Sequence, residues 1–459
     1  MQQTYWKFSS ENLDKTALVD EQGNELSFRM LNKEVDVFIS NLPHYKALVF
    51  AKVSNTKASI VTYLACLKAN HPLLLLDASL SDDLLDRLVS CYRPNIICCD
   101  GIIKQLHHDI LTLNSNLSLL LSTSGSTGSP KLVRLSANNL NANAESIAQY
   151  LRITCNDRAI TTLPMSYSYG LSVINSHFLK GAAVVLSDDG IISREFWNKI
   201  NDAKVSTMAG VPFLYQMLRK LKYKRFNTQG IRYITQAGGK LDIDSINYFQ
   251  GECAAQGQEF VVMYGQTEAT ARMSYVPFDK LSSKAGSIGI AIPKGCLSII
   301  DSSGGEVKES FVEGEIQYSG PNVMLGYAES LSDLALGDES KGKLDTGDLG
   351  YFDEDSFFYI TGRLKRFIKM HGLRISLDVI EEWLLCKDYE TVVTGVDDQL
   401  IVCLVGNVDE IKLKKLLVDE YKININNINV KILIEFPRTA NGKINYKQLL
   451  HDAIGGLHG

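Results

Sequence analysis

Short apolar runs alternate with longer amphipathic segments along the first part of the chain. Residues 16–28 have the pattern of two short strands around a turn, and residues 31–42 have helical periodicity. Residues 47–52 are typical of a strand, residues 58–69 of an apolar-rich helix, and residues 72–76 of a buried strand. Strands that alternate with helices in this way predict a layered α/β fold with parallel strands.

The middle of the chain continues this pattern and then changes. Ser136 is suited to cap a helix that runs to about residue 151. Residues 182–186 and 207–210 are further strand candidates. From about residue 286 to residue 327, short strand patterns are separated by glycine turns, which indicates a small β subdomain.

A domain boundary is expected at residues 363–365, which separates a large N-terminal domain, residues 1–363, from a small C-terminal domain, residues 364–459. The C-terminal part has alternating helix and strand patterns: a helix at 377–386, strands at 391–395 and 400–406, and a helix at 409–421. This pattern over about 95 residues predicts a compact α+β domain.

Length and charge narrow the possible classes of protein. A chain of 459 residues and 50.9 kDa is expected to hold more than one domain. The net charge of −5 argues against nucleic acid as a partner. The C-terminal domain has no basic tail, because its 13 Lys and Arg are balanced by 13 Asp and Glu.

The cysteines and the start of the chain bear on location. The nine cysteines include no Cys-x-x-Cys pair, which is typical of reduced, mostly buried thiols in a cytosolic protein and gives no zinc-site spacing. The first ten residues lack the apolar core of a signal peptide, and no apolar run is long enough to span a bilayer. We therefore expect a cytoplasmic protein without a membrane span.

The stretch Ser122–Lys131 holds six hydroxyl side chains, two glycines and one lysine. Such a composition suits a loop that wraps an anion such as a polyphosphate, because glycines let the backbone N–H groups approach the anion and the lysine adds positive charge. A flexible linker is the alternative. Strand-like runs at 119–121 and 132–135 directly flank the stretch and favour the phosphate loop.

This loop is not of the Walker type. Counted from Gly125, the second glycine of that motif falls on Pro130, and Leu132 follows the lysine in place of Ser or Thr. The segment after the loop alternates like a strand, whereas a Walker loop opens a helix. A P-loop ATPase or kinase is therefore disfavoured.

Further motifs follow the loop in order, and together they resemble those of the adenylate-forming superfamily, which includes acyl-CoA synthetases, adenylation domains of peptide synthetases and luciferases. The matching segments are Ala237–Leu241, Tyr264–Glu268, Gly314–Ile316, Gly326–Tyr327, Thr346–Asp348, Gly362–Lys365 and Pro437–Lys443. With the serine-rich loop they span residues 122–443.

The resemblance implies a reaction in two halves. A carboxylate attacks the α-phosphorus of ATP and expels pyrophosphate, and the acyl-adenylate then reacts with a thiol. The implied ligands are ATP, Mg²⁺, a small carboxylic acid and CoA, with the phosphopantetheine of an acyl carrier protein as the alternative acceptor. The implied fold is a large domain of layered α/β subdomains with a small β subdomain, followed by a small mobile α+β domain.

The resemblance assigns most nucleotide contacts to the N-terminal domain. Thr267 would reach the α-phosphate and Glu268 would bind Mg²⁺, for which a hard oxygen ligand is suited. The alternative for Glu268 is a solvated surface carboxylate, and for Tyr264, whose ring would pack on adenine, a core tyrosine. The residues expected to hold the phosphates or line the nucleotide are Thr123, Ser124, Gly125, Ser126, Thr127, Gly128, Lys131, Gly238, Gly239, Lys240, Gly265 and Gln266.

Motifs nearer the C-terminus complete the expected nucleotide site. Asp348 and Arg363 would bind the ribose hydroxyls, with a structural ion pair as the alternative for each. Lys443 would bridge the substrate carboxylate and the α-phosphate, which lowers the repulsion between two anions, and an exposed lysine is the alternative.

The resemblance also implies that the C-terminal domain rotates between the two half-reactions. Lys365 occupies the hinge position of the family. Rotation would replace Lys443 by the loop that contains Lys369, His371 and Gly372, along which a pantetheine arm would run. His371 is either a base for the thiol or, as the favoured alternative, an ordinary loop residue.

The acyl pocket is indicated by residues 164–172. Amino-acid-activating relatives place an Asp where Gly170 falls, so a buried ammonium would be unpaired here and an acid without an α-amine is favoured. Tyr167 stands where many acyl- and aryl-CoA ligases have His. The other residues expected to line the pocket are Tyr169, Val211, Pro212, Met263 and Met273. A tyrosine-rich wall favours a modest or hydroxylated acid over a long fatty chain.

Four functions share these residues. An acyl-CoA synthetase is the leading hypothesis, and a ligase that loads a carrier protein is the second. A non-catalytic nucleotide-binding relative is disfavoured by the presence of Lys443, Glu268 and the phosphate loop. A luciferase-like oxygenase has the same site and is disfavoured because most relatives with this site emit no light.

Overall fold

The computed structural model describes residues 4–122, 131–364, 366–370, 373–406, 408–439 and 442–455. The chain divides into two compact units, residues 1–297 with 318–344, and residues 298–317 with 345–459. The domain boundary expected at residues 363–365 stays a prediction. No helix within the described ranges combines the length and the apolarity needed to cross a membrane.

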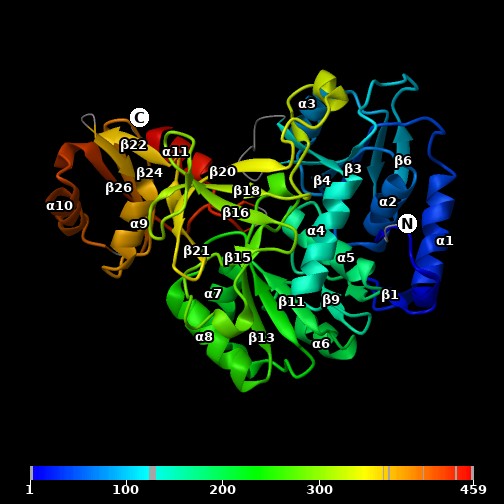
Figure 1. Cartoon of the computed structure of the whole chain (residues 1–459), viewed down its shortest axis with the longest axis horizontal. Helices are drawn as coiled ribbons and strands as arrows, with labels where there is room; N and C mark the ends of the chain where they lie inside the picture. Colours follow the sequence, from blue (N-terminus) through cyan, green and yellow to red (C-terminus); the bar gives the residue numbers. More distant parts are fainter. Residues whose placement is uncertain are drawn as a thin grey trace. The chain divides into compact units, whose positions relative to one another are not determined.

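The first unit contains two large sheets (Figure 1). In the described residues the first of these sheets has seven strands, in the order β19 (Gly326–Ala328), β8 (Leu132–Ser136), β7 (Leu117–Ser122), β4 (Leu73–Asp77), β3 (Val49–Val53), β5 (Ile96–Cys99) and β6 (Ile102–Gln105). Strands β7, β4, β3 and β5 are parallel, as the strand and helix alternation predicts.

The other sheet has nine strands in the same described ranges. Their order is β15 (Ile290–Ala291), β14 (Ser274–Tyr275), β13 (Glu259–Tyr264), β12 (Tyr233–Gln236), β11 (Thr207–Gly210), β9 (Arg158–Ile160), β10 (Ala183–Val185), β1 (Thr16–Val19) and β2 (Glu25–Ser27). From β13 to β1 the neighbouring strands are parallel, so their carboxyl ends meet at one edge.

Helices cover both sheets. Their bounds in the first unit are α1 (Phe28–Ile39), α2 (Lys57–Lys68), α3 (Asp82–Tyr92), α4 (Ala137–Tyr150), α5 (Ser168–Leu179), α6 (Arg194–Asp202), α7 (Pro212–Leu221) and α8 (Ile243–Ala255). α4 packs on α5, and the two contact β8 and β9 respectively, so this pair lies between the two sheets (Figure 1). As predicted, the Ser136 side chain caps α4 by accepting from Asn139 N.

Most residues of the third sheet belong to the second unit. Within the described chain its strands are β17 (Glu306–Val307), β16 (Cys296–Ile300), β18 (Gly314–Ser319), β20 (Lys343–Phe352) and β21 (Phe358–Arg363). The expectation that residues 286–327 form one β subdomain is wrong in its bounds. β15 joins the nine-stranded sheet and β19 the seven-stranded one, because short strands of similar pattern leave the pairing partner open.

The C-terminal part of the second unit has the predicted α+β pattern. Its elements are β22 (Phe367–Met370), β23 (Leu373–Ser376), α9 (Leu377–Leu385), β24 (Thr391–Val396), β25 (Gln399–Val405), α10 (Glu410–Tyr421), β26 (Ile428–Leu433) and α11 (Tyr446–Gly455). α9 and α10 pack on the small sheet through a shared apolar core that includes Ile380, Val402 and Leu413.

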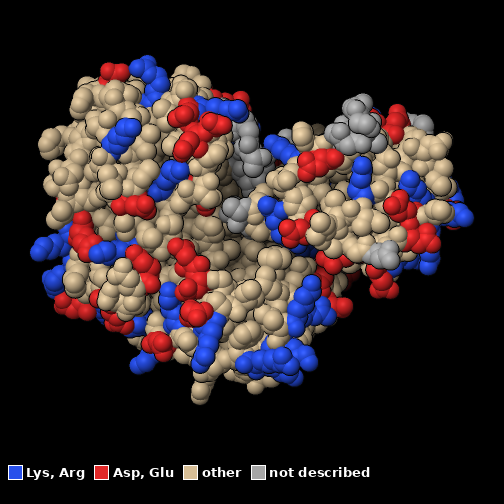
Figure 2. Space-filling view, turned by 180° about the vertical axis from the view of Figure 1, so that it is seen from behind, with Lys and Arg blue, Asp and Glu red and all other residues tan. Residues whose placement is uncertain are grey.

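On the face seen in Figure 2, acidic and basic side chains are interspersed, which agrees with the small net charge.

The expectation of mostly buried thiols is wrong, because Cys66, Cys98, Cys253 and Cys403 are buried and the other five cysteines are exposed or half-buried.

Candidate active site

The predicted Mg²⁺ ligand lies in a tight turn at the carboxyl end of β13. Tyr264 is the last residue of this strand, and Thr267 begins a short 3₁₀ helix, Thr267–Ala269. Gly265 must be glycine, because a Cβ atom there would lie 1.7 Å from the carbonyl oxygen of Ala271. The turn therefore folds back on itself where parallel α/β sheets usually bind ligands.

A tyrosine joins two of the predicted phosphate-site residues. The hydroxyl of Tyr327, on β19, donates to Glu268 Oε1 at 2.9 Å. Lys131 Nζ lies 3.7 Å from the centroid of the same ring and 3.8 Å from Glu329 Oε1. Burial, and then the charge of Glu268, raise the pKa of Tyr327 well above its ordinary range, so its hydroxyl keeps its proton and remains a donor.

Asn322 fixes the turn that carries Glu268. Its Nδ2 donates to the backbone carbonyl oxygens of Ala269 at 2.8 Å and Arg272 at 3.0 Å. The backbone carbonyl oxygen of Asn322 accepts from Thr270 Oγ1 at 2.6 Å. Thr270 has φ of 67°, a left-handed conformation that is costly for a β-branched residue. These hydrogen bonds hold the strained turn in place.

The glycine turn expected beside adenine lies on the same edge of the nine-stranded sheet. β12 and β13 are parallel neighbours with Gln236 opposite Val262, so the residues after Gln236 lie beside the β13 turn. Gly238 has φ of 87°, and the buried Gln236 side chain donates to Gly239 O at 2.8 Å. Lys240 follows and is exposed.

The expected acyl motif forms the start of α5, a helix that is buried along most of its length. The Tyr169 hydroxyl is 2.9 Å from both Thr235 O and Thr235 Oγ1, on β12. Ser168 Oγ lies 3.2 Å from Thr267 Oγ1, which links this motif to the Glu268 turn. Of the remaining expected pocket residues, Pro212 is half-buried. The buried ones are Tyr167, Val211, Met263 and Met273.

Gly170 leaves no space for a side chain. A Cβ atom at this position would lie 2.4 Å from the carbonyl oxygen of Pro164 and 2.8 Å from that of Leu163. An aspartate cannot be accommodated there without moving the backbone.

Asp348 and Arg363 are paired in the second unit. They lie opposite each other on β20 and β21, and Arg363 Nε donates to Asp348 Oδ1 at 2.9 Å. Asp348 is buried, and its backbone N–H donates to Thr346 Oγ1 at 3.1 Å. The sequence left a ribose contact and an ion pair open for both residues, and a ribose role stays a prediction.

Hydrogen bonds hold the described residues around Lys443, which lies in the second unit. Thr439 N donates to Lys443 O at 2.8 Å, and Asn445 N donates to Pro437 O at 2.8 Å. Gly442 has φ of 74°, and the Arg438 guanidinium donates to its carbonyl oxygen at 3.0 Å. The backbone around Lys443 is thus held by its neighbours on both sides.

Several expected site residues lie outside the described part of the chain: Thr123, Ser124, Gly125, Ser126, Thr127, Gly128, Lys365, His371 and Gly372. Lys369, on β22, is exposed, and its backbone N–H donates to Asp397 Oδ1 at 2.9 Å. On either side of Lys365, Arg363 pairs with Asp348 and Arg366 with Asp378 and Glu381.

The described residues could supply a magnesium ion with one ligand, and the bound phosphates would have to supply others. No three His, Cys, Asp or Glu side chains in these ranges converge on a metal position. Glu268 is a half-buried carboxylate whose second oxygen is a hard ligand. Mg²⁺ is typically held by one or two carboxylates together with substrate phosphates, so Glu268 suits this mode.

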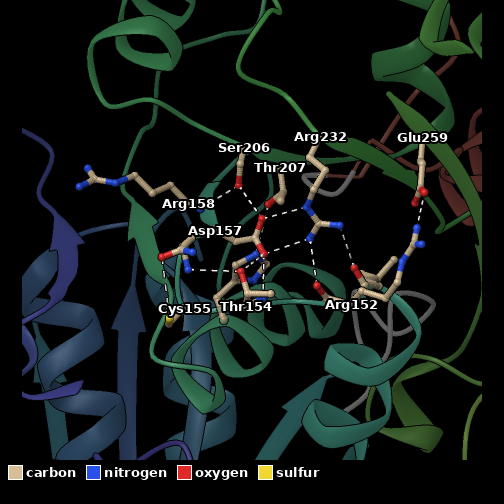
Figure 3. A network of polar contacts seen from close by, with 12 residues as sticks. Arg152, Thr154, Cys155, Asp157, Arg158, Ser206, Thr207, Arg232 and Glu259 are labelled. Carbon is tan, nitrogen blue, oxygen red and sulfur yellow. Dashed lines mark hydrogen bonds and ion pairs between the residues drawn. The ribbon is translucent and has the colours of Figure 1, made fainter. Parts of the chain in front are cut away.

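A second polar network, at the amino ends of β9, β11 and β12, is structural in character (Figure 3). Asp157 accepts from Arg232 Nε at 3.1 Å and Nη2 at 3.0 Å, from Ser206 Oγ at 2.9 Å, and from Thr154 N at 2.8 Å. Burial opposes its ionisation, but the hydrogen bonds from Arg232 and Thr154 prevail and lower the pKa of Asp157. Every charge in this cluster has a partner.

Two residues at the site were not predicted from the sequence. Tyr327 lies in a recognised motif but had no assigned role, because its link to Glu268 joins residues 59 positions apart. Arg272 was not predicted either, although a lone basic residue four positions after Glu268, behind the small residues Ala269–Ala271, is a usable signal.

Three comparisons show which known proteins the chain is similar to. A family model described as AMP-binding enzyme matches residues 108–328. The chain is 31% identical to an oxalate–CoA ligase of Arabidopsis thaliana over 56% of this chain and 50% of that protein. It is 28% identical to a long-chain-fatty-acid–CoA ligase of Bacillus subtilis over 66% of this chain and 55% of that protein. The matched stretch thus spans about half the length of these curated relatives.

A solved structure shows the same fold over nearly the whole chain. It is that of o-succinylbenzoate CoA synthetase from Bacillus subtilis in complex with an acyl-adenylate intermediate, with a TM-score of 0.80 and 23% identity, covering 98% of both chains. At this identity the likeness concerns the fold.

Proposed function

The chain belongs to the adenylate-forming superfamily, and from this premise we propose that it activates a carboxylic acid with ATP and transfers the acyl group to a thiol. In the first step a carboxylate oxygen attacks the α-phosphorus, the bond to the β-phosphate oxygen breaks, and pyrophosphate leaves. In the second step a thiol sulfur attacks the acyl carbon and AMP leaves.

The arrangement of Glu268, Tyr327 and Lys131 carries this proposal. A carboxylate suited to Mg²⁺ and an ammonium suited to phosphate contact the same tyrosine, at 2.9 Å and 3.7 Å. A triphosphate with its metal needs both kinds of group, because negative charge gathers on the leaving pyrophosphate. Mg²⁺ would supply charge neutralisation there, held by Glu268 and the phosphates.

The remaining residues take the roles that their motifs imply. Thr267 contacts the α-phosphate, Tyr264 and the turn at Gly238 hold adenine, and Asp348 with Arg363 binds the ribose. Lys443 is the cation of the reacting centre, because it neutralises the substrate carboxylate and the α-phosphate as they approach. Lys365 is the hinge, flanked by two arginines with carboxylate partners.

The acid is proposed to lack an α-amine. An α-ammonium buried in the acyl pocket needs a carboxylate partner, and position 170 has no room for one. The proposed acceptor is CoA, since the oxalate–CoA ligase and the long-chain-fatty-acid–CoA ligase described above use it by name. A carrier-protein thiol is separated from CoA by supplying each acceptor to the preformed acyl-adenylate and measuring AMP release.

A lysine substitution tests the proposed reaction. Lys443→Ala is expected to lower acid-dependent pyrophosphate exchange about 10²–10³-fold while ATP binding stays unchanged, because the lost charge acts on the transition state. Exchange of labelled pyrophosphate into ATP and equilibrium nucleotide binding measure the two effects. Lys447→Ala, an exposed lysine four residues further on, is the matched control and should behave like the wild type.

Two results would contradict the proposal. Exchange at a near wild-type rate in Lys443→Ala would remove Lys443 from the reacting centre. A folded wild-type protein that forms no AMP with any short, hydroxylated, aryl or dicarboxylic acid would reject the ligase function itself.

A further inference from the structure

Arg272 is a buried cation beside residues that are expected to line the acyl pocket. It follows the Glu268 turn, and only 1% of its surface is exposed. Its guanidinium carbon lies 4.1 Å from the centroid of the Tyr169 ring, and its Nη1 lies 2.6 Å from Met263 Sδ. Both neighbours are expected pocket residues, so the guanidinium borders the space predicted for the acid.

The partners of Arg272 are all neutral in the part of the chain that the structure describes. Nη1 also donates to the Tyr150 hydroxyl at 3.2 Å, and Nη2 donates to Ser172 Oγ at 3.1 Å. Among these residues the buried Nε has no hydrogen-bond partner, and no carboxylate forms an ion pair with this arginine. A buried charge without an opposite charge is costly, and a ligand anion would remove that cost.

A small cavity lies against the guanidinium. Its volume is about 10 Å³, the space of roughly one water molecule or one carboxylate oxygen. Helices α4 and α5 and strands β11 and β12 line it together with Arg272, and its polar lining residues include Ser176, Thr207 and Thr235. A position for an oxygen atom thus exists beside the arginine.

The cavity has no second cation among its described lining residues. His177 lines it, and burial lowers the pKa of this imidazole to about 4, so that it is neutral near pH 7. Its Nδ1 donates to Val173 O at 2.8 Å and its Nε2 accepts from Thr207 Oγ1 at 3.2 Å. Arg272 is therefore the positive charge that an incoming anion would meet there.

We propose that Arg272 binds a second carboxylate of the acid, so that the substrate of this protein is a dicarboxylic acid. One carboxylate reacts at the α-phosphate and the other accepts hydrogen bonds from the Arg272 guanidinium. This inference rests on the proposed function and names the substrate class of the same site. The buried guanidinium selects the acid by charge, because a neutral group in its place leaves the cation uncompensated.

Matched pairs of acids test the proposal. Malonate, succinate and glutarate are compared with their monoamides, which keep the size of each acid and remove the second charge. Pyrophosphate release measures kcat/KM for each acid. The wild type is expected to prefer a diacid over its monoamide by at least about 100-fold, since a buried polar site that is left unpaired rejects a ligand by up to roughly 10⁴–10⁵-fold.

Substitution of the arginine should abolish this preference. Arg272→Met keeps a long side chain without charge and is expected to bring the ratio of diacid to monoamide close to one, with an unchanged KM for ATP. Arg272→Lys should keep part of the preference. Arg152→Met is the control, because Arg152 is exposed and pairs with Glu259 at the opposite end of β13, and it should retain the wild-type ratio.

The outcomes separate this proposal from the proposed function. Equal use of diacid and monoamide by the wild type, or an equal loss of both in Arg272→Met, overturns the role of Arg272. If Arg272→Met does not fold, the wild-type ratio and Arg272→Lys decide. If no acid releases pyrophosphate, the ligase function fails, and thermal stabilisation by each diacid, present in the wild type, reduced in Arg272→Lys and lost in Arg272→Met, still decides whether Arg272 binds a carboxylate.

Discussion

Arg134 and Arg272 are both fully buried in the first unit, and their surroundings are opposite. Arg134, on β8, donates to the carbonyl oxygens of Tyr327 at 2.9 Å and Leu336 at 2.5 Å, and to Glu339 Oε2 at 2.5 Å. Arg272 contacts hydroxyls, a thioether and an aromatic ring. Within the described residues, one cation is compensated by the protein and the other is not.

The difference separates a structural residue from a binding residue. Arg134 ties β8 to β19, and Gly326 allows this, since a Cβ atom there would lie 2.7 Å from Arg134 Nη2 and 2.6 Å from Glu339 Oε2. This contact holds Tyr327, and through it the position of Glu268. A buried charge that has its partners stabilises the fold, whereas one that lacks them is suited to bind a ligand.

The largest expected effect is on stability. Arg134→Met should lower the free energy of unfolding by about 3–5 kcal/mol, because it leaves several buried carbonyl oxygens without a donor, at roughly 1–3 kcal/mol each, and removes the partner of the half-exposed Glu339. Arg272→Met should cost about 1 kcal/mol or less, because its neutral partners lose weaker bonds. Urea unfolding at about pH 7.5 measures both. An equal loss in the two variants would contradict the comparison.

Protonation of His177, which lines the cavity beside Arg272, should destabilise the folded protein. The pKa of His177 is about 4 in the folded protein and near 6.5 when unfolded, so the unfolded chain binds the additional proton between these values. Stability is therefore retained above about pH 6.5 and falls as the pH drops toward 4, by up to about 3 kcal/mol from this residue.

The variant His177→Gln isolates that contribution. Its urea midpoint should vary less between about pH 7 and pH 5 than that of the wild type, because the proton-binding site is gone. Identical pH profiles for the two proteins would show that His177 titrates normally and that the cavity accepts a cation.

The smallest expected effects follow from removing the Tyr327 hydroxyl, through which the Arg134 contact holds Glu268 in position. Tyr327→Phe removes the hydrogen bond to Glu268 and should cost about 1 kcal/mol of stability. Under the proposed function, the Mg²⁺ concentration for half-maximal pyrophosphate release should rise about 10-fold, because Glu268 loses the group that orients it.

A control tyrosine distinguishes this role from a general packing effect. Tyr45→Phe removes a buried hydroxyl that has no hydrogen-bond partner in the described residues, so the Mg²⁺ dependence should stay at the wild-type value. A Tyr327→Phe protein with the same Mg²⁺ dependence as Tyr45→Phe would remove Tyr327 from the metal site.

Much of the fold was predictable because local patterns dominate it. The Ser136 cap and helix α4, the paired strands β1 and β2, and the pattern from α9 to α10 are confirmed within one or two residues at most of their ends. Helix α5 was not predicted, because it is buried on nearly all sides and lacks the polar face that reveals an amphipathic helix.

The candidate site was predictable only where its residues form short motifs. Tyr264, Thr267 and Glu268 lie within five consecutive residues, so their types and spacing indicate a nucleotide site from the sequence. Tyr327 reaches this group from another sheet, and no local pattern reveals that contact.

The amino-acid sequence by itself indicated the α/β layers and the resemblance of its short motifs to those of adenylate-forming enzymes, because these depend on residues close together in the chain. The tertiary structure alone decided which buried charges have partners. Arg134 and Arg272 are the same residue type, and their difference arises from groups 100 or more positions away, such as Ser172 for Arg272 and Glu339 for Arg134. Charge compensation depends on distance in space, and folding sets that distance.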